Sequence, residues 1–87
     1  MKKVIEKKIK PEYFQLILDG KKKFELRLDE FEIEEGDTLL LREYEDEKYT
    51  GREIQKDVLY VRNLKVQNLH WPIEEVMKKG LKIISFN

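Results

Sequence analysis

Residues 38–62 read TLLLREYEDEKYTGREIQKDVLYVR, and this segment predicts a long β-hairpin. The continuous leucine run at 39–41 is typical of a strand that is covered on both faces. The charged residues 45–48 form the connection, and a second strand follows at about residues 52–62. Because the two strands are joined by a short connection, we expect them to pair antiparallel.

Three further strands are expected outside the hairpin. Residues 3–9 contain β-branched side chains of mixed polarity, and residues 23–28 alternate with period two. Residues 81–86 also alternate, less cleanly. The chain therefore predicts five short strands.

Two short amphipathic helices complete the pattern. Pro11 opens the first helix and Gly20 ends it, and Pro72 and Gly80 bracket the second in the same way. The expected order is β-α-β-β-β-α-β. The apolar stripe of the first helix comprises Phe14, Ile17 and Leu18.

The chain of 87 residues is expected to form a single domain over residues 1–87. A domain of this size buries only about 60–65% of its unfolded surface. One flat sheet of five strands cannot bury two helices and the leucine run as well. We therefore expect an α+β fold, a small, partly closed β-barrel whose openings are plugged by the helices. A ferredoxin-like two-layer sandwich is the alternative.

The composition excludes several kinds of site. With no cysteine and one histidine, the chain has no disulfide framework, no thiol nucleophile and no multi-histidine metal site. No apolar run approaches the length of a membrane span, and the lysine-rich N-terminus lacks the apolar core of a signal peptide. We expect a cytoplasmic protein with no metal, cofactor or membrane partner. Charged residues, mostly Lys and Glu, make up 41% of the chain, a composition typical of thermophiles.

The formal net charge is zero, but the charge is unevenly distributed along the chain. Residues 1–23 hold eight lysines against three acidic residues, whereas residues 24–48 hold eleven acidic residues against three basic ones. A basic face can therefore form on a neutral protein. Alternatively, the oppositely charged segments pair across the fold and cancel.

Residues 20–27, GKKKFELR, combine a glycine turn, a lysine cluster and a strand. Alternation along the strand places Glu25 and Arg27 on one face and Phe24 on the other, where it is expected in the core. Lys22, Glu25 and Arg27 are therefore the candidate site. The alternative is that these side chains form ordinary surface pairs around a solvated turn.

Residues 11–27, the turn at 35–37 and residues 49–52 resemble the ASCH domains, and within them a small branch catalogued as a domain of unknown function. The resemblance spans roughly residues 3–62. Its central pattern is Gly-x-Lys-x-x-Glu-x-Arg. The fixed positions are met by Gly20, Lys22, Glu25 and Arg27.

The resemblance implies a fold similar to the PUA domains, a pseudo-barrel of five or six strands. It also implies RNA or nucleotide binding in a cleft lined by the motif. Some ASCH-like proteins hydrolyse the amide of acylated cytidine nucleosides with a lysine, a threonine and a glutamate. The lysine falls on Lys22 here, but Glu25 occupies the threonine position.

As a binding module for RNA, a nucleotide or a nucleoside, the chain offers phosphate donors and stacking surfaces. Arg27 can clamp a phosphate, while Lys22 supplies a point charge. Glu25 can orient Arg27 or accept a hydrogen bond from a base amine. Aromatic rings beside arginines suit unstacked bases, although hairpin tyrosines also form cross-strand packing pairs. The stacking candidates are Tyr44 and Tyr49, next to Arg52.

Two other functions stay open from the sequence. An amidohydrolase acting on acylated nucleosides would use Lys22 for proton transfer or as nucleophile, with Glu25 or Glu53 as its acid/base partner. An adaptor would bind another protein through its acidic face. The sequence leaves the oligomeric state open.

Overall fold

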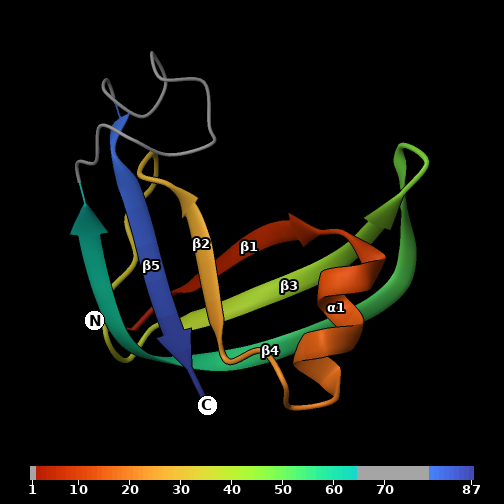
Figure 1. Ribbon diagram of the computed structural model, residues 1–87, viewed down its shortest axis with the longest axis horizontal. Coiled ribbons are helices and arrows are strands. Elements are labelled where there is room, and N and C mark those ends of the chain that lie inside the picture. The colour runs from red at the N-terminus through yellow and green to blue at the C-terminus, as the bar shows by residue number, and fades with distance from the viewer. Residues whose placement is uncertain (1, 65–78) are drawn as a thin grey trace.

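The computed structural model describes residues 2–64 and 79–87, which form one helix and five strands (Figure 1). These elements confirm the α+β class and the expected order as far as they extend. The second helix, expected from Pro72, lies outside the described residues. In chain order the elements are β1 (Val4–Ile9), α1 (Pro11–Leu18), β2 (Phe24–Leu28), β3 (Thr38–Glu45), β4 (Lys48–Leu64) and β5 (Leu81–Phe86).

The β3–β4 hairpin is antiparallel, as predicted. Its ladder runs from the pair Thr38 and Asp57 to the pair Glu45 and Lys48, with an irregularity between Arg42 and Tyr44. β4 begins at Lys48, so residues 49–51 belong to the strand and not to the connection. The leucine run alternates between buried and half-buried positions, so one face of β3 supplies the core.

The strands form one mixed sheet in the order β1-β3-β4-β5-β2. β4 spans 17 residues and has two partners in succession, β3 along its first part and β5 from Val58 onward. β1 lies parallel to β3, and the other pairs are antiparallel. Figure 1 shows two wings that meet along the curved β4: β1 and β3 form one wing, β2 and β5 the other.

The sheet is open, which corrects the expected closed or partly closed barrel. β1 and β2 are its edges, and no backbone ladder joins them in the part of the chain that the structure describes. β4 pairs first with β3 and then with β5, so the outer strands β1 and β2 belong to different wings and lie on opposite sides of a cleft. One side-chain bond spans the opening, from Arg27 Nη2 on β2 to the carbonyl oxygen of Lys8 on β1, at 2.7 Å.

Helix α1 packs on the wing that contains β3. Pro11 occupies its first turn, where the missing N–H costs nothing, and Phe14 and Ile17 are buried as predicted. Leu18, which was expected in the same stripe, is 51% exposed. It is the last helical residue, and no described residue covers it.

The apolar core draws on α1, on every strand except β2, and on the loop before β3. Burial of each large apolar side chain contributes about 1.5–3 kcal/mol, so these contacts supply most of the stability. β2 contributes a buried carboxylate instead. The core cluster comprises Ile9, Phe14, Ile17, Ile33, Leu39, Leu41, Val58, Ile84 and Phe86.

Asp37 fixes the turn ahead of β3. Its carboxylate accepts hydrogen bonds from the backbone N–H groups of Glu34 (2.8 Å) and Lys3 (3.1 Å). These bonds hold the pKa of the Asp37 carboxyl below its usual value, the Glu34 N–H having the larger effect. The Asp37 carbonyl also accepts from the Val58 N–H, so the starts of β1 and β3 meet β4 at this residue.

Asp37→Asn tests this role because it removes the charge and keeps the side-chain size. Because the pKa of Asp37 is lowered in the folded state, its ionised carboxylate stabilises the folded protein at pH values above the ordinary pKa of 3.8. This contribution to stability is lost as the pH falls through the lowered pKa. In thermal unfolding, we expect the midpoint of the wild type to fall with acidification in that window, and the fall to be shallower in Asp37→Asn. Asp46→Asn, at an exposed turn residue, should keep the wild-type profile. Identical profiles for the wild type and Asp37→Asn would contradict this role.

Candidate functional site

A cleft of about 430 Å³ lies between the end of β1, the start of α1 and the strand β2. Its volume falls in the range of small-molecule binding sites. It is lined by four cationic residues, one acidic residue and several apolar residues. The cleft is formed by Lys8, Ile9, Lys10, Tyr13, Lys22, Phe24, Glu25, Leu26 and Arg27.

The turn after α1 places Lys22 at this cleft. Gly20 adopts φ +76°, a left-handed conformation that favours glycine, and its N–H bonds the carbonyl of Ile17. The N–H groups of Lys21 and Lys22 both bond the carbonyl of Leu16, which completes a Schellman-type helix end. The chain therefore reverses within three residues, and the Lys22 ammonium reaches β2.

Glu25 is the centre of the site. Its side chain is 7% exposed, and each carboxylate oxygen has its own cation: Lys22 Nζ lies 2.9 Å from Oε1, and Arg27 Nε lies 2.8 Å from Oε2. The structure thus brings together the three residues that the motif predicted. The predicted alternation was right but the buried face was not, because Glu25 points inward and Phe24 is 49% exposed. Two paired cations make the buried carboxylate tolerable.

Arg27 has hydrogen-bond donors that the described residues do not use. Nε bonds Glu25 and Nη2 bonds the carbonyl of Lys8, which leaves three of the five guanidinium hydrogens without a protein partner among the described residues. Its side chain is 27% exposed. Lys22 Nζ likewise uses two hydrogens, on Glu25 and on the carbonyl of Phe24. The site can therefore still donate to an anion.

Two aromatic rings flank the Lys22 ammonium. Nζ lies 4.5 Å from the centroid of Phe24 and 5.8 Å from that of Tyr13. Both residues are substantially exposed, 49% for Phe24 and 42% for Tyr13. Exposed rings beside cations offer stacking surfaces for a flat ligand.

Tyr44 and Tyr49 do not line this cleft. They are cross-strand neighbours in the β3–β4 hairpin and pack edge to face, with ring centroids 5.2 Å apart. The cross-strand packing alternative is thus what the structure shows. The Arg42 guanidinium lies 3.8 Å from the Tyr49 ring centroid, and Lys8 Nζ lies 4.3 Å from that of Tyr44.

Arg52, the third binding candidate of the hairpin, does not line the cleft. It forms two hydrogen bonds with the buried carboxylate of Glu43, at 2.8 and 3.0 Å, and reaches Gln15 on α1. These bonds and that from the Thr50 hydroxyl hold the pKa of the Glu43 carboxyl below its usual value, and Glu43 raises the pKa of Arg52. Arg52 therefore fastens α1 to the hairpin. Glu53 is exposed opposite Arg42 on β3, and it is also outside the cleft.

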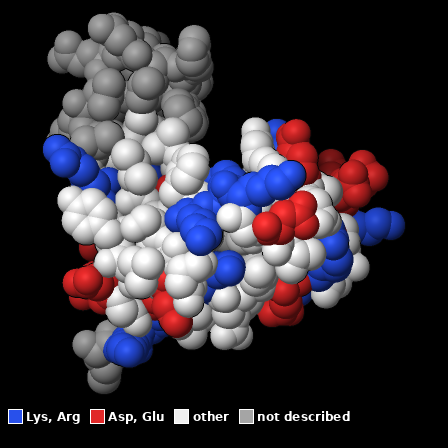
Figure 2. All heavy atoms as spheres, turned by 60° about the horizontal axis from the view of Figure 1, so that its bottom comes forward, with Lys and Arg blue, Asp and Glu red and all other residues white. Residues whose placement is uncertain are grey.

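Lys8 and Lys10 are cleft residues that were not among the predicted site residues. They come from the other wing of the sheet, where β1 ends beside β2. The available signal was the lysine-rich N-terminal segment, but only the fold shows which of its lysines meet the motif. Figure 2 shows basic side chains gathered across the middle of one face of the molecule, with acidic side chains toward its sides.

Metal and membrane features are not found in the part of the chain that the structure describes. Within those residues, no group of three or more His, Cys, Asp or Glu side chains is arranged to hold a metal ion. None of the described helices has the length and apolar character needed to cross a bilayer.

Fold and site together define a small α+β domain with an open mixed sheet and a basic cleft between its edges. The family described as "Domain of unknown function (DUF3850)" matches residues 4–73, and the chain belongs to this family. An uncharacterized 12.9 kDa protein in the GpA 3′ region of Escherichia phage P2 is 39% identical over 64 residues. The match covers 74% of this chain and 59% of the phage protein, so the chain spans only about three-fifths of that relative.

A solved structure shares the fold. The crystal structure of hypothetical protein PH0355 matches with a TM-score of 0.75 over 98% of this chain and 97% of the other. The two sequences are 20% identical. At that identity the likeness concerns the fold alone.

Arg27→Ala tests whether the charge network supports the fold. It leaves Glu25 with one of two cationic partners and frees the Lys8 carbonyl, so we expect a loss of about 1–3 kcal/mol in the free energy of unfolding, measured with urea. Arg62→Ala, at an exposed position on β4, should change it by less than about 0.5 kcal/mol. Arg27→Ala combined with Glu25→Gln should recover part of the loss, because the buried carboxylate that has lost one of its two cationic partners is then replaced by a neutral amide. Equal losses of unfolding free energy in Arg27→Ala and Arg62→Ala would contradict the role of Arg27.

Proposed function

We propose that this domain binds RNA or a nucleotide in the cleft between β1 and β2. The observation that carries the proposal is that four cationic residues and one acidic residue line or adjoin this cleft in a chain of zero net charge, with the Lys8 ammonium at its edge toward Tyr44. The cations are Lys8, Lys10, Lys22 and Arg27. The carboxylate is already occupied by two of them, so the remaining positive charge is available to a phosphate.

The donors suit a phosphate group in particular. Arg27 presents a planar guanidinium that Glu25 and the Lys8 carbonyl hold in one orientation. A fixed guanidinium loses less side-chain entropy on binding than a free one and matches the oxygens of a phosphate. Lys10 has no partner among the described residues and adds a second, mobile charge at the rim.

The apolar part of the cleft suits a base. Tyr13 and Phe24 expose their rings beside the Lys22 ammonium. A base can stack on such a ring only when it is unpaired, which favours a nucleotide or a single strand over a duplex. Each stacked base contributes about 1–3 kcal/mol.

The proposal includes membership of the ASCH and PUA-like group. Three of the four motif positions, Lys22, Glu25 and Arg27, line the cleft, and the fourth, Gly20, makes the turn that positions Lys22. Five strands in a strongly curved sheet agree with a PUA-like arrangement, although this sheet is open.

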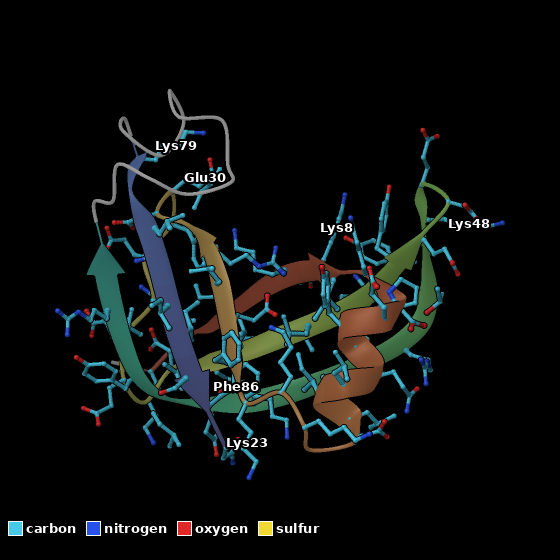
Figure 3. All side chains as sticks on the ribbon, in the orientation of Figure 1. Lys8, Lys23, Glu30, Lys48, Lys79 and Phe86 are labelled. Carbon is cyan, nitrogen blue, oxygen red and sulfur yellow. The ribbon has the colours of Figure 1, made fainter. Side chains whose placement is uncertain are left out.

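Lys10→Ala is the cleanest test, because this side chain contributes to no described bond. We expect the Kd for a short single-stranded RNA at low salt to rise about two- to fivefold and the salt dependence to become shallower by about one charge. Fluorescence anisotropy measures both. Lys48→Ala is the matched control, since Lys48 lies at the far end of the hairpin (Figure 3). No binding by the wild type, or equal losses in the two variants, would refute the proposed site.

A second candidate function is hydrolysis of an acylated cytidine nucleoside. The observation in its favour is the 2.9 Å contact between Lys22 Nζ and Glu25 in one cleft, a pair that can pass a proton. Water would add to the amide carbonyl, and the acid and the free amine would be released. Incubation with N4-acetylcytidine, followed by chromatography, should show product in the wild type and none in Lys22→Met. Absence of product from the wild type rejects this function.

A further inference from the structure

A second, shallower hollow adjoins the cleft. Its volume is about 470 Å³, and Lys10 lines both cavities. Tyr44 forms part of its wall. Lys10 therefore stands between the cleft and the β3–β4 hairpin.

Lys8 makes the same connection from β1. Its carbonyl holds Arg27 at the cleft, while its ammonium lies 4.3 Å from the Tyr44 ring centroid and 5.9 Å from that of Tyr49. Figure 3 shows Lys8 at the end of β1, beside α1 and the base of the hairpin. Lys8 and Lys10 thus form a basic ridge with the Arg27 site on one side and the tyrosine pair on the other.

The tyrosine pair offers a second stacking surface. Tyr49 is 39% exposed, and the Arg42 guanidinium lies over its ring at 3.8 Å. Aromatic rings and arginine planes are both surfaces on which unstacked bases lie. The edge-to-face packing with Tyr44 holds the Tyr49 ring in place before any ligand arrives.

The charges around the hollow restrict the path of a strand. Its far side is acidic, with Glu12, Glu45 and Asp46, and would repel a phosphate. Among the described residues that line the hollow, Lys10 is the cationic one, so Lys10 and the neighbouring Lys8 are placed to carry the sugar-phosphate backbone. A base beyond the ridge then faces the tyrosines and carboxylates, which can accept from its amino groups.

We propose that the ligand is a single strand of at least two nucleotides, one held in the cleft and the next on the Tyr44–Tyr49 pair, with the linking phosphate on the ridge of Lys8 and Lys10. This inference rests on the proposed function. It names the ligand class as an oligonucleotide rather than a free nucleotide. It also assigns Tyr44 and Tyr49 to a second base-binding site, separate from the cleft.

The test compares ligand lengths by calorimetric titration at low salt. Cytidine 5′-monophosphate and 5′-phosphorylated oligocytidylates of two and three residues are titrated against the full chain. One additional stacked base and phosphate predict at least a tenfold lower Kd for the dinucleotide than for the mononucleotide. Tyr49→Ala should lower this ratio to the contribution of the linking phosphate alone. Tyr49→Leu keeps an apolar side chain against Tyr44 but removes the ring, and it should do the same.

Tyr60→Ala is the matched control, because Tyr60 is an exposed tyrosine on the part of β4 that pairs with β5 rather than with β3, and its ratio should equal that of the wild type. If the mononucleotide binds and the wild type binds the longer ligand no more tightly, the second base-binding site is refuted while the proposed function stands. If the ratio is high but unchanged in Tyr49→Leu, the strand follows another path and the inference also fails. If neither ligand binds, the proposed function itself fails.

Discussion

A carboxylate that would be costly to bury alone ties the two wings of this protein together. Glu25 faces inward from β2, and its oxygens are divided between Lys22 and Arg27. Arg27 then reaches across the opening of the sheet to the Lys8 carbonyl. A buried charge costs several kcal/mol unless it is paired. Ion pairs therefore join the turn after α1 to β2, and the hydrogen bond from Arg27 to the Lys8 carbonyl joins β2 to the end of β1. β2 needs this support, because it gives no side chain to the apolar core cluster.

The opening of the sheet is a consequence of β4. One strand of 17 residues with two successive partners carries the sheet around a bend, and the strands at its two ends face each other without pairing. α1 fills part of the enclosed space, and the remainder is the cleft. Positive charge gathers there because the lysine-rich first segment and the GKKKFELR segment end on opposite sides of the same gap. The site and the curvature of the sheet therefore have one origin.

Much of the fold could be predicted from local patterns. The hairpin, the first helix and the strand positions follow from alternation, from Pro11 and from Gly20, all of which act over a few residues. Local patterns could not predict whether the sheet closes into a barrel, since this depends on how the two edge strands, β1 and β2, lie relative to each other. The inward face of β2 was misjudged because hydrophobicity favours Phe24, whereas charge contacts with two residues close in sequence, Lys22 and Arg27, favour Glu25.

The site could also be predicted only in part, because local patterns indicate contacts between residues close in sequence but not contacts between distant segments. Lys22, Glu25 and Arg27 lie within six residues, and the motif brings them together in any strand. Lys8 and Lys10 join them only through the parallel pairing of β1 with β3. The sequence alone does not show that Arg52 bonds Glu43, because this contact depends on the register of the β3–β4 hairpin. Lys82 shows the same limit: it is 2% exposed and is satisfied by Asp29 and Asn63, which the alternation of β5 alone does not indicate.

The open edges also bear on how the protein behaves at high concentration. Unpaired strands recruit strands from neighbouring molecules, and long cationic side chains along an edge oppose such association. Lys8 on β1 and Arg27 on β2 lie at the two edges that are unpaired here. The cationic residues at the cleft thus also oppose association between sheet edges, and a less basic cleft would weaken this protection against aggregation.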